Sequence, residues 1–133
     1  MIVYLDTSAA FKLVHKESQS TALVDWFSSL ADLKPVSSQL MRVELLGNLA
    51  AKHTSLVAAG HNLLEHIGLV GVRPHHLNAA IDLVGEGLRT LDAIHLATAL
   101  SIGSELEAFV TYDQNQAEVA NQHGVRVLSP GLS

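Results

Sequence analysis

The sequence contains no cysteine among its 133 residues. This absence excludes a disulfide-stabilised scaffold, a zinc site with thiolate ligands and a cysteine nucleophile. It also lacks an HExxH motif and both glycine-rich phosphate-binding patterns, GxxxxGK[ST] and GxGxxG, so a zinc enzyme or a glycine-loop nucleotide-binding protein has little support. Any chemistry must come from other side chains.

Charged residues are also few. They make up 16% of the chain and give a net charge of -5 with histidine neutral, whereas 48% of the residues are apolar. This composition excludes a disordered chain and indicates that much of the helix surface is covered by a sheet or by a partner. It argues against a broad basic surface for nucleic acid, but phosphates can still be reached through a bound cation.

The sequence shows no targeting or membrane segment. The start, MIVYLDTS, has no basic region before its apolar run, so we predict no signal peptide. No apolar run approaches the roughly 20 residues needed to cross a bilayer. We therefore expect a cytoplasmic protein without membrane contact, and the length fits a single domain over residues 1–133.

Short strands are predicted to alternate with helices. The strand candidates are 2–5, 67–72, part of 107–113 and 125–127, with a brief connection or strand at Pro35 and Val36. The helix candidates are 7–16, 18–32, 38–52, 55–66, 75–87, 90–100 and 114–124. No hairpin signal such as Asn-Gly occurs, so the pattern predicts an α/β domain with a central, mainly parallel sheet flanked by helices.

Two aspartates follow expected strands. Asp6 comes directly after the first strand, and Asp113 closes the segment FVTYD. Ligands in parallel α/β sheets bind beyond the carboxyl ends of the strands, which favours a functional role for both acids. A structural role stays open for each, because Asp6 can help to cap a helix at Thr7 or Ser8, and Asp113 with Gln116 is similar to a capping box.

Two further acids lie on largely apolar helices. Glu44 is in the middle of SQLMRVELLGNLAAK without a cation one turn away, and Asp92 is in the first turn of TLDAIHLATAL. A buried, unpaired carboxylate tends to protonate or to bind a cation. Asp92 can alternatively interact with the helix dipole after a Thr90 cap. His95 lies on the same side as Asp92, and we expect it to orient the site by hydrogen bonding near Asp92 rather than to bind metal.

Together the four acids predict a metal site. Carboxylate oxygens without nitrogen or sulfur ligands suit Mg²⁺ or Mn²⁺, and a divalent ion relieves the repulsion among clustered carboxylates. Such an ion supports hydrolysis of phosphodiesters. Two other acidic α/β families fit less well: a phosphoaspartate hydrolase needs a second aspartate two residues after Asp6, and a response-regulator receiver needs a lysine after a late strand.

Four segments resemble a PIN domain, specifically a VapC-type toxin ribonuclease: VYLDTSA, SSQLMRVELLGNLA, LRTLDAIHLATAL and VTYDQN. The resemblance covers essentially the whole chain, and LDAIHLATAL is its most specific part. One departure is Gln114-Asn115-Gln116, where a more apolar residue is expected near the third position.

The resemblance implies a three-layer PIN-like fold and a set of site residues. The catalytic and metal-binding acids are then Asp6, Glu44, Asp92 and Asp113, with Mg²⁺ or Mn²⁺ as cofactor. The supporting polar residues are Thr7, Ser8 and Thr111, and His95 joins them because it lies on the same side of its helix as Asp92. Candidates for phosphate contacts are Lys12, Lys16 and Arg89.

The resemblance further implies an endoribonuclease toxin that hydrolyses tRNA or rRNA with a metal-activated water, forms a homodimer and is inhibited by a cognate antitoxin protein. We expect an apolar dimer or antitoxin interface among Phe11, Leu13, Trp26, Phe27, Leu45, Leu46 and Leu49. Two alternatives stay open. One is a PIN-fold module that binds RNA or protein without cleavage, and the other is a metal-dependent phosphoesterase for another substrate.

Overall fold

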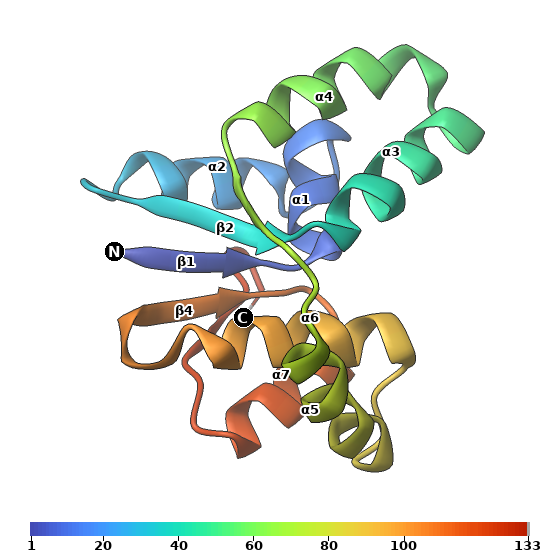
Figure 1. Cartoon of the computed structure of the whole chain (residues 1–133). Coiled ribbons are helices and arrows are strands. Elements are labelled where there is room, and N and C mark those ends of the chain that lie inside the picture. The colour runs from blue at the N-terminus through green and yellow to red at the C-terminus, as the bar shows by residue number, and fades with distance from the viewer. Residues whose placement is uncertain (133) are drawn as a thin grey trace.

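The computed structural model describes residues 1–132, which form a three-layer α/β fold (Figure 1). The middle layer is a five-stranded parallel sheet with the order β3-β2-β1-β4-β5. Its strands are β1 (Ile2–Leu5), β2 (Lys34–Ser38), β3 (Gly68–Val70), β4 (Leu106–Val110) and β5 (Val127–Leu128). The expected α/β fold with a parallel sheet is confirmed.

The helices form the two outer layers. They are α1 (Thr7–Val14), α2 (Ser20–Ser28), α3 (Leu40–Lys52), α4 (Val57–Glu65), α5 (Pro74–Gly85), α6 (Thr90–Ser101) and α7 (Gln114–Gln122), with single 3₁₀ turns at Thr54–Leu56 and Gly103–Glu105. In Figure 1, α1 to α4 lie above the sheet and α5 to α7 lie below it. The first half of the chain therefore covers one face of the sheet and the second half covers the other.

The central strand β1 supplies side chains to both hydrophobic cores. Val3 and Leu5 pack with the helices of the first half, whereas Tyr4 packs with Phe109 and the helices of the second half. Successive side chains of a strand point to opposite faces, and a strand covered on both faces is apolar throughout. This explains the uninterrupted apolar run of β1, and it directs Tyr4 toward α6.

The segment around Pro35 is a strand rather than a connection. In β2, Pro35 pairs with Val3 of β1, but the pairing with β3 begins only at Val36. Proline lacks a backbone N–H and is tolerated where a strand has no neighbour on that side. The sheet accommodates Pro35 because β3 is short.

Two of the residues predicted to form an apolar interface are not at the surface. Leu45 and Leu49 are fully buried and belong to the core between the sheet and the helices of the first half. The other members of the predicted interface are partly buried against this core. Within residues 1–132, no helix has the length and hydropathy to cross a membrane.

Candidate active site

The order of the strands places a crevice beside β1. The chain runs outward from β1 to β2 and β3, then crosses to β4 on the other side of β1. At such a switch point the loops beyond the two neighbouring strands diverge and leave room for a ligand. Asp6 follows β1, and the segment from Thr111 to Asp113 follows β4, so both strand-end acids lie at this point.

Asp6 is held in place by several donors. Its carboxylate accepts hydrogen bonds from Ser8 Oγ at 2.5 Å, from Ala9 N at 3.2 Å and from Thr111 Oγ1. Asp6 itself is the N-cap of α1, so the capping role considered for it is confirmed, and α1 begins at Thr7. Asp6 is only 3% exposed, and burial raises its pKa even though Ser8 and Thr111 act in the opposite direction.

Glu44 projects from α3 toward α1 and α6. Its Oε1 accepts a hydrogen bond from Thr7 Oγ1 at 2.9 Å and lies 2.5 Å from Nε2 of His95. Burial tends to raise the pKa of Glu44, but the interactions with His95 and Thr7 outweigh it and lower the pKa. We expected the hydrogen bond of His95 near Asp92, and the structure places it at Glu44 instead, because the imidazole is buried and lies toward α3 and β1.

Asp92 and Asp113 share one counter-ion. Nε of Arg89 lies 3.5 Å from Oδ2 of Asp92, and Nη2 lies 3.5 Å from Oδ2 of Asp113. Burial and then the charge of Asp113 raise the pKa of Asp92, whereas Arg89 lowers it. The side chain of Arg89 is 82% exposed, so solvent weakens both ion pairs.

The prediction for the start of α6 is wrong, whereas the one for the start of α7 is confirmed in part. Thr90 is the first residue of α6 rather than its cap, and the preceding Arg89 makes no side-chain capping bond. Asp113 does cap α7, accepting a hydrogen bond from Gln116 N at 2.8 Å. The reciprocal half of the capping box is missing, because the buried amide of Gln116 has no hydrogen-bond partner within residues 1–132.

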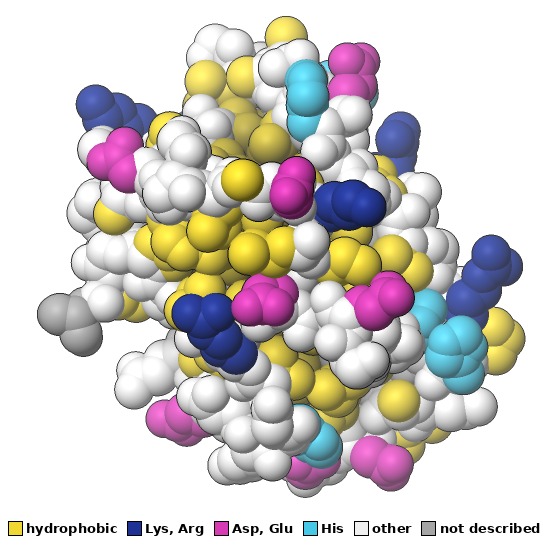
Figure 2. All heavy atoms as spheres, turned by 90° about the vertical axis from the view of Figure 1, so that its left-hand side faces the viewer, with side chains coloured by type: hydrophobic (Ala, Val, Ile, Leu, Met, Phe, Trp, Pro, Cys, Tyr) yellow, Lys and Arg dark blue, Asp and Glu magenta, His cyan; other side chains and the backbone are white. Residues whose placement is uncertain are grey.

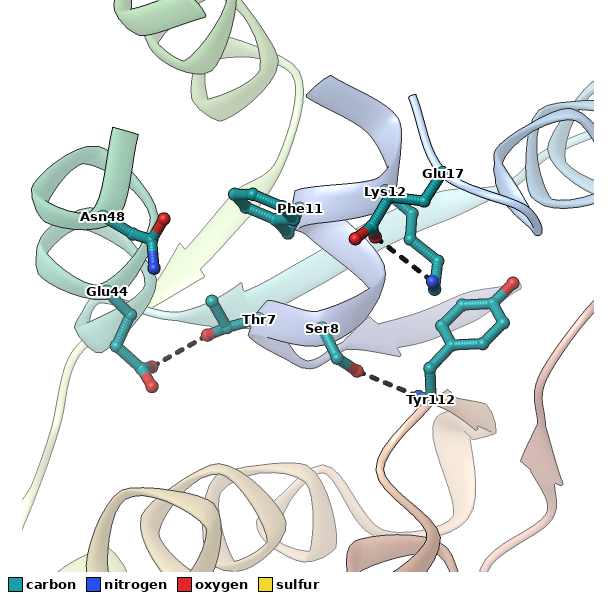
Figure 3. Close-up of a pocket in the computed structure, with 8 residues that line it drawn as sticks. All are labelled: Thr7, Ser8, Phe11, Lys12, Glu17, Glu44, Asn48 and Tyr112. Carbon is teal, nitrogen blue, oxygen red and sulfur yellow. Dashed lines mark hydrogen bonds and ion pairs between the residues drawn. The ribbon is translucent and has the colours of Figure 1, made fainter. Parts of the chain in front are cut away.

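A cavity of about 370 Å³ opens beside Glu44 (Figure 3). Its walls come from α1, α3 and the loops after α1 and β4, with the lining residues Thr7, Ser8, Phe11, Lys12, Glu17, Glu44, Asn48 and Tyr112. A second cavity, of about 360 Å³, is lined by Glu44, Arg89, Thr90, Leu91 and Asp92. Glu44 therefore borders both cavities, and it shares the second one with Asp92 of α6.

The predicted phosphate-binding residues have different surroundings. Lys12 is largely enclosed: Nζ donates to Glu17 at 3.2 Å and to Gln19 at 2.9 Å, and lies 4.8 Å from the centre of the Tyr112 ring. Lys16 is exposed beyond the end of α1, and Arg89 is the only one of the three that contacts the acids. On the face drawn in Figure 2, basic side chains stand apart rather than in one basic patch.

The donor atoms fit a hard divalent cation. The four acids offer only oxygen ligands, and burial together with the nearby charge of Asp113 raises the pKa of Asp92, a cost that a bound cation offsets. As the side chains lie, however, no three acids or histidines of residues 1–132 are grouped closely enough to hold an ion. The guanidinium of Arg89 lies against both Asp92 and Asp113 in this arrangement.

One contact escaped the sequence analysis. The phenolic oxygen of Tyr4 lies 2.6 Å from Nδ1 of His95, on the side of the imidazole away from Glu44. The only available signal was that a buried tyrosine hydroxyl needs a hydrogen-bond partner. Nothing in the local pattern of β1 identifies that partner, because His95 lies 91 positions further along the chain.

Comparison with known proteins identifies the family. Residues 3–122 match the PIN domain family. Two relatives from Mycobacterium tuberculosis span nearly the whole chain: Ribonuclease VapC46, 39% identical over 96% of this chain and 97% of the relative, and Ribonuclease VapC35, 36% identical over 98% of both. A toxin–antitoxin complex from Klebsiella pneumoniae contains a chain of the same fold, with a TM-score of 0.71 and 17% identity over 96% of this chain and 97% of that one. The chain therefore belongs to the PIN domain family and is of the VapC type.

Proposed function

We propose that this protein is a metal-dependent endoribonuclease and the toxin of a toxin–antitoxin pair. One observation carries the proposal: four carboxylates from distant segments surround the carboxyl ends of β1 and β4, where Thr7 beside Asp6 binds Glu44 and Arg89 pairs with both Asp92 and Asp113. Asp6 and Asp113 come from the strand ends, and Glu44 and Asp92 come from the helices beside them. The ribonuclease names of relatives at 36% and 39% identity support the same activity.

The four acids are proposed to hold Mg²⁺ or Mn²⁺ and to face the scissile phosphate. When bound, such an ion polarises a phosphoryl oxygen and lowers the pKa of water. Ser8 and Thr111 fix the carboxylate of Asp6, and Thr7 fixes that of Glu44, so these hydroxyls keep the acids oriented. The cavity beside Glu44 provides space for a segment of the substrate next to the cleaved bond.

Arg89 is the best-placed of the three basic candidates for contact with RNA. Its guanidinium is exposed and adjoins Asp92 and Asp113, so it can turn from these acids to a phosphate when a cation takes its place. Lys16 is exposed at the end of α1, whereas Lys12 must first leave Glu17 and Gln19. The proposed substrates are tRNA or rRNA, and the proposed compartment is the cytoplasm.

A cognate antitoxin and a second copy of the chain are the proposed protein partners. The antitoxin is supported by the matching fold in the Klebsiella pneumoniae toxin–antitoxin complex. For the homodimer, α5 offers an exposed apolar stripe, because Leu77, Ile81 and Val84 follow one another at helical spacing. Replacement of Ile81 by lysine should then convert the dimer to a monomer in sedimentation analysis, while an unchanged dimer places the interface elsewhere.

The test of the activity is cleavage of total RNA by the purified protein with Mn²⁺ or Mg²⁺. Asp92→Asn and a chelator should each abolish cleavage. Asp25→Asn is the matched control, since Asp25 is an exposed acid on α2 outside the cavities lined by Glu44. Fragment ends then identify the RNA that is cut.

Other outcomes favour the remaining alternatives. If the wild type binds Mn²⁺ and RNA but cleaves nothing, a binding module replaces the nuclease. If it hydrolyses only DNA or small phosphate esters, it is a phosphoesterase of another kind. Equal cleavage by wild type and Asp92→Asn means that the activity belongs to a contaminant or to another site.

A further inference from the structure

Tyr4, His95 and Glu44 form a continuous chain of hydrogen bonds from the core to the acidic site. Nδ1 of His95 lies 2.6 Å from the phenolic oxygen of Tyr4, and Nε2 lies 2.5 Å from Oε1 of Glu44. The imidazole is only 1% exposed, so both ring nitrogens depend on these protein partners. Tyr4 is itself fixed by parallel stacking on Phe109, with 5.3 Å between the ring centres.

Tyr4 and Glu44, the two partners of the imidazole, determine which nitrogen of His95 carries the proton. A carboxylate only accepts hydrogen bonds, and Oε1 of Glu44 lies within hydrogen-bond distance of Nε2. Nε2 must therefore donate. With the proton on Nε2, Nδ1 is an acceptor, and the phenolic O–H of Tyr4 donates to it. A neutral imidazole with its proton on Nε2 satisfies every atom of the chain.

The hydrogen bonds from His95 and Thr7 also distinguish the two oxygens of Glu44. His95 and Thr7 both bond to Oε1, at 2.5 and 2.9 Å. Within residues 1–132, no hydrogen bond is formed to Oε2. Glu44 is thus held by one oxygen, and the other oxygen is left to interact beyond the protein.

We propose that His95 is a positioning residue of the nuclease, held by Tyr4 in its Nε2–H form so that it fixes one oxygen of Glu44 and leaves the other for the cation and the substrate. This inference rests on the proposed function. From the sequence, His95 was predicted to orient Asp92. Here His95 orients Glu44 instead, and Tyr4 holds His95 in place.

His76 provides a built-in comparison for a purely structural role. It is also buried, and its Nδ1 and Nε2 are hydrogen-bonded to Arg73 N at 3.1 Å and to Ser101 Oγ at 3.0 Å. These partners link α5 to α6 and include none of the four acids. If replacing His95 lowers kcat more than replacing His76 does, the difference reflects the contact with Glu44 rather than core packing.

The experiment compares His95→Leu, His95→Gln, Tyr4→Phe and His76→Leu in the full chain. His95→Leu should lower kcat by about 10- to 100-fold with little change in KM, the usual range for residues that orient metal ligands. His95→Gln should recover part of kcat, since its amide is again a donor. His76→Leu should lower the melting temperature but leave kcat unchanged.

Tyr4→Phe is the variant that preserves the fold most closely, because the ring still stacks on Phe109. The ring ¹⁵N shifts of His95 at constant pH should show the Nε2–H form in the wild type and a mixture of forms in Tyr4→Phe. An Nδ1–H form in the wild type overturns the proposal, as does equal kcat for His95→Leu and His76→Leu.

A separate readout distinguishes failure of this inference from failure of the proposed function. If the wild type cleaves no RNA, the nuclease assignment fails, and calorimetry with Mn²⁺ alone then decides the role of His95. Weaker Mn²⁺ binding by His95→Leu than by His76→Leu supports the positioning role. Equal binding by both variants, or no binding by the wild type, overturns it.

Discussion

Arg89 and Asp113 form an ion pair of 3.5 Å between segments that lie on either side of β4 in the chain. The same guanidinium reaches Asp92, so it occupies the position between two of the proposed cation ligands. A divalent cation that binds there must overcome this positive charge. Arg89 is therefore expected to weaken cation binding. Without a cation, its positive charge offsets the repulsion between the two carboxylates.

Arg89→Gln should bind Mn²⁺ more tightly than the wild type. Because the guanidinium is exposed, the gain should be modest, about three- to tenfold at low salt, and smaller as ionic strength rises. Calorimetry measures the affinity, and Arg89→Lys is the control that keeps the charge. Weaker binding by Arg89→Gln than by the wild type contradicts competition between Arg89 and the cation.

Asp92→Asn should stabilise the metal-free protein while it abolishes cleavage. The pKa of Asp92 is raised in the folded state, so the folded protein binds this proton more tightly than the unfolded chain does. The contribution of Asp92 to stability therefore falls as the pH rises from the ordinary value of 3.8 through the folded value. At pH 7 the variant should therefore melt at a higher temperature than the wild type.

The pH and the cation provide the controls for this variant. Well below pH 3.8 the difference in melting temperature should vanish, because Asp92 is then protonated in both states. Saturating Mn²⁺ should raise the melting temperature of the wild type more than that of Asp92→Asn. A variant that is less stable than the wild type at pH 7 without metal shows that the carboxylate is compensated by contacts within the protein.

Thr111→Val should reduce both stability and activity. The buried hydroxyl of Thr111 donates to Asp6 and accepts a hydrogen bond from Asp113 N at 3.1 Å, so valine leaves both groups without this partner. We expect a loss of about 1 to 3 kcal/mol in the free energy of unfolding. Urea denaturation measures it, with Thr111→Ser as the variant that keeps the hydroxyl. A loss for serine as large as the loss for valine contradicts this role of the hydroxyl, because serine keeps the hydroxyl and valine does not.

Gln116→Leu should stabilise the protein. The amide of Gln116 is fully buried, and neither its nitrogen nor its oxygen has a hydrogen-bond partner within residues 1–132. An apolar side chain of similar size removes the cost of desolvating this amide, which is about 1 to 3 kcal/mol. Urea denaturation should show a gain in unfolding free energy of about 1 kcal/mol. A loss of stability reveals an ordered water bound to the amide.

The sequence made the fold and the positions of the acids predictable because these depend on local patterns. The apolar run before Asp6 is a strand by composition alone, and an acid directly after it must lie at the carboxyl end of the sheet. The unusual polarity of Gln116 was visible in the same way. Such features involve only neighbours along the chain.

The contacts inside the site depend on tertiary packing and were not predictable from local patterns. Glu44 and His95 are 51 positions apart, and whether the imidazole turns to Glu44 or to Asp92 depends on how α3 and α6 approach each other. The strand at Pro35 was ambiguous for a similar reason. Its pairing is possible only because β3 is too short to need the missing N–H.

The pairing of β1 with β4 also determines when the site can form during synthesis. Asp6 and Thr111, which bond across this pair, are 105 positions apart. A ribosome makes β1 early and β4 late, so a growing chain passes through most of its translation without Asp113 or the hydroxyl that anchors Asp6. A nonsense mutation anywhere before β4 therefore yields a fragment that lacks a complete acidic site, and any toxicity can begin only when nearly the whole domain has been translated.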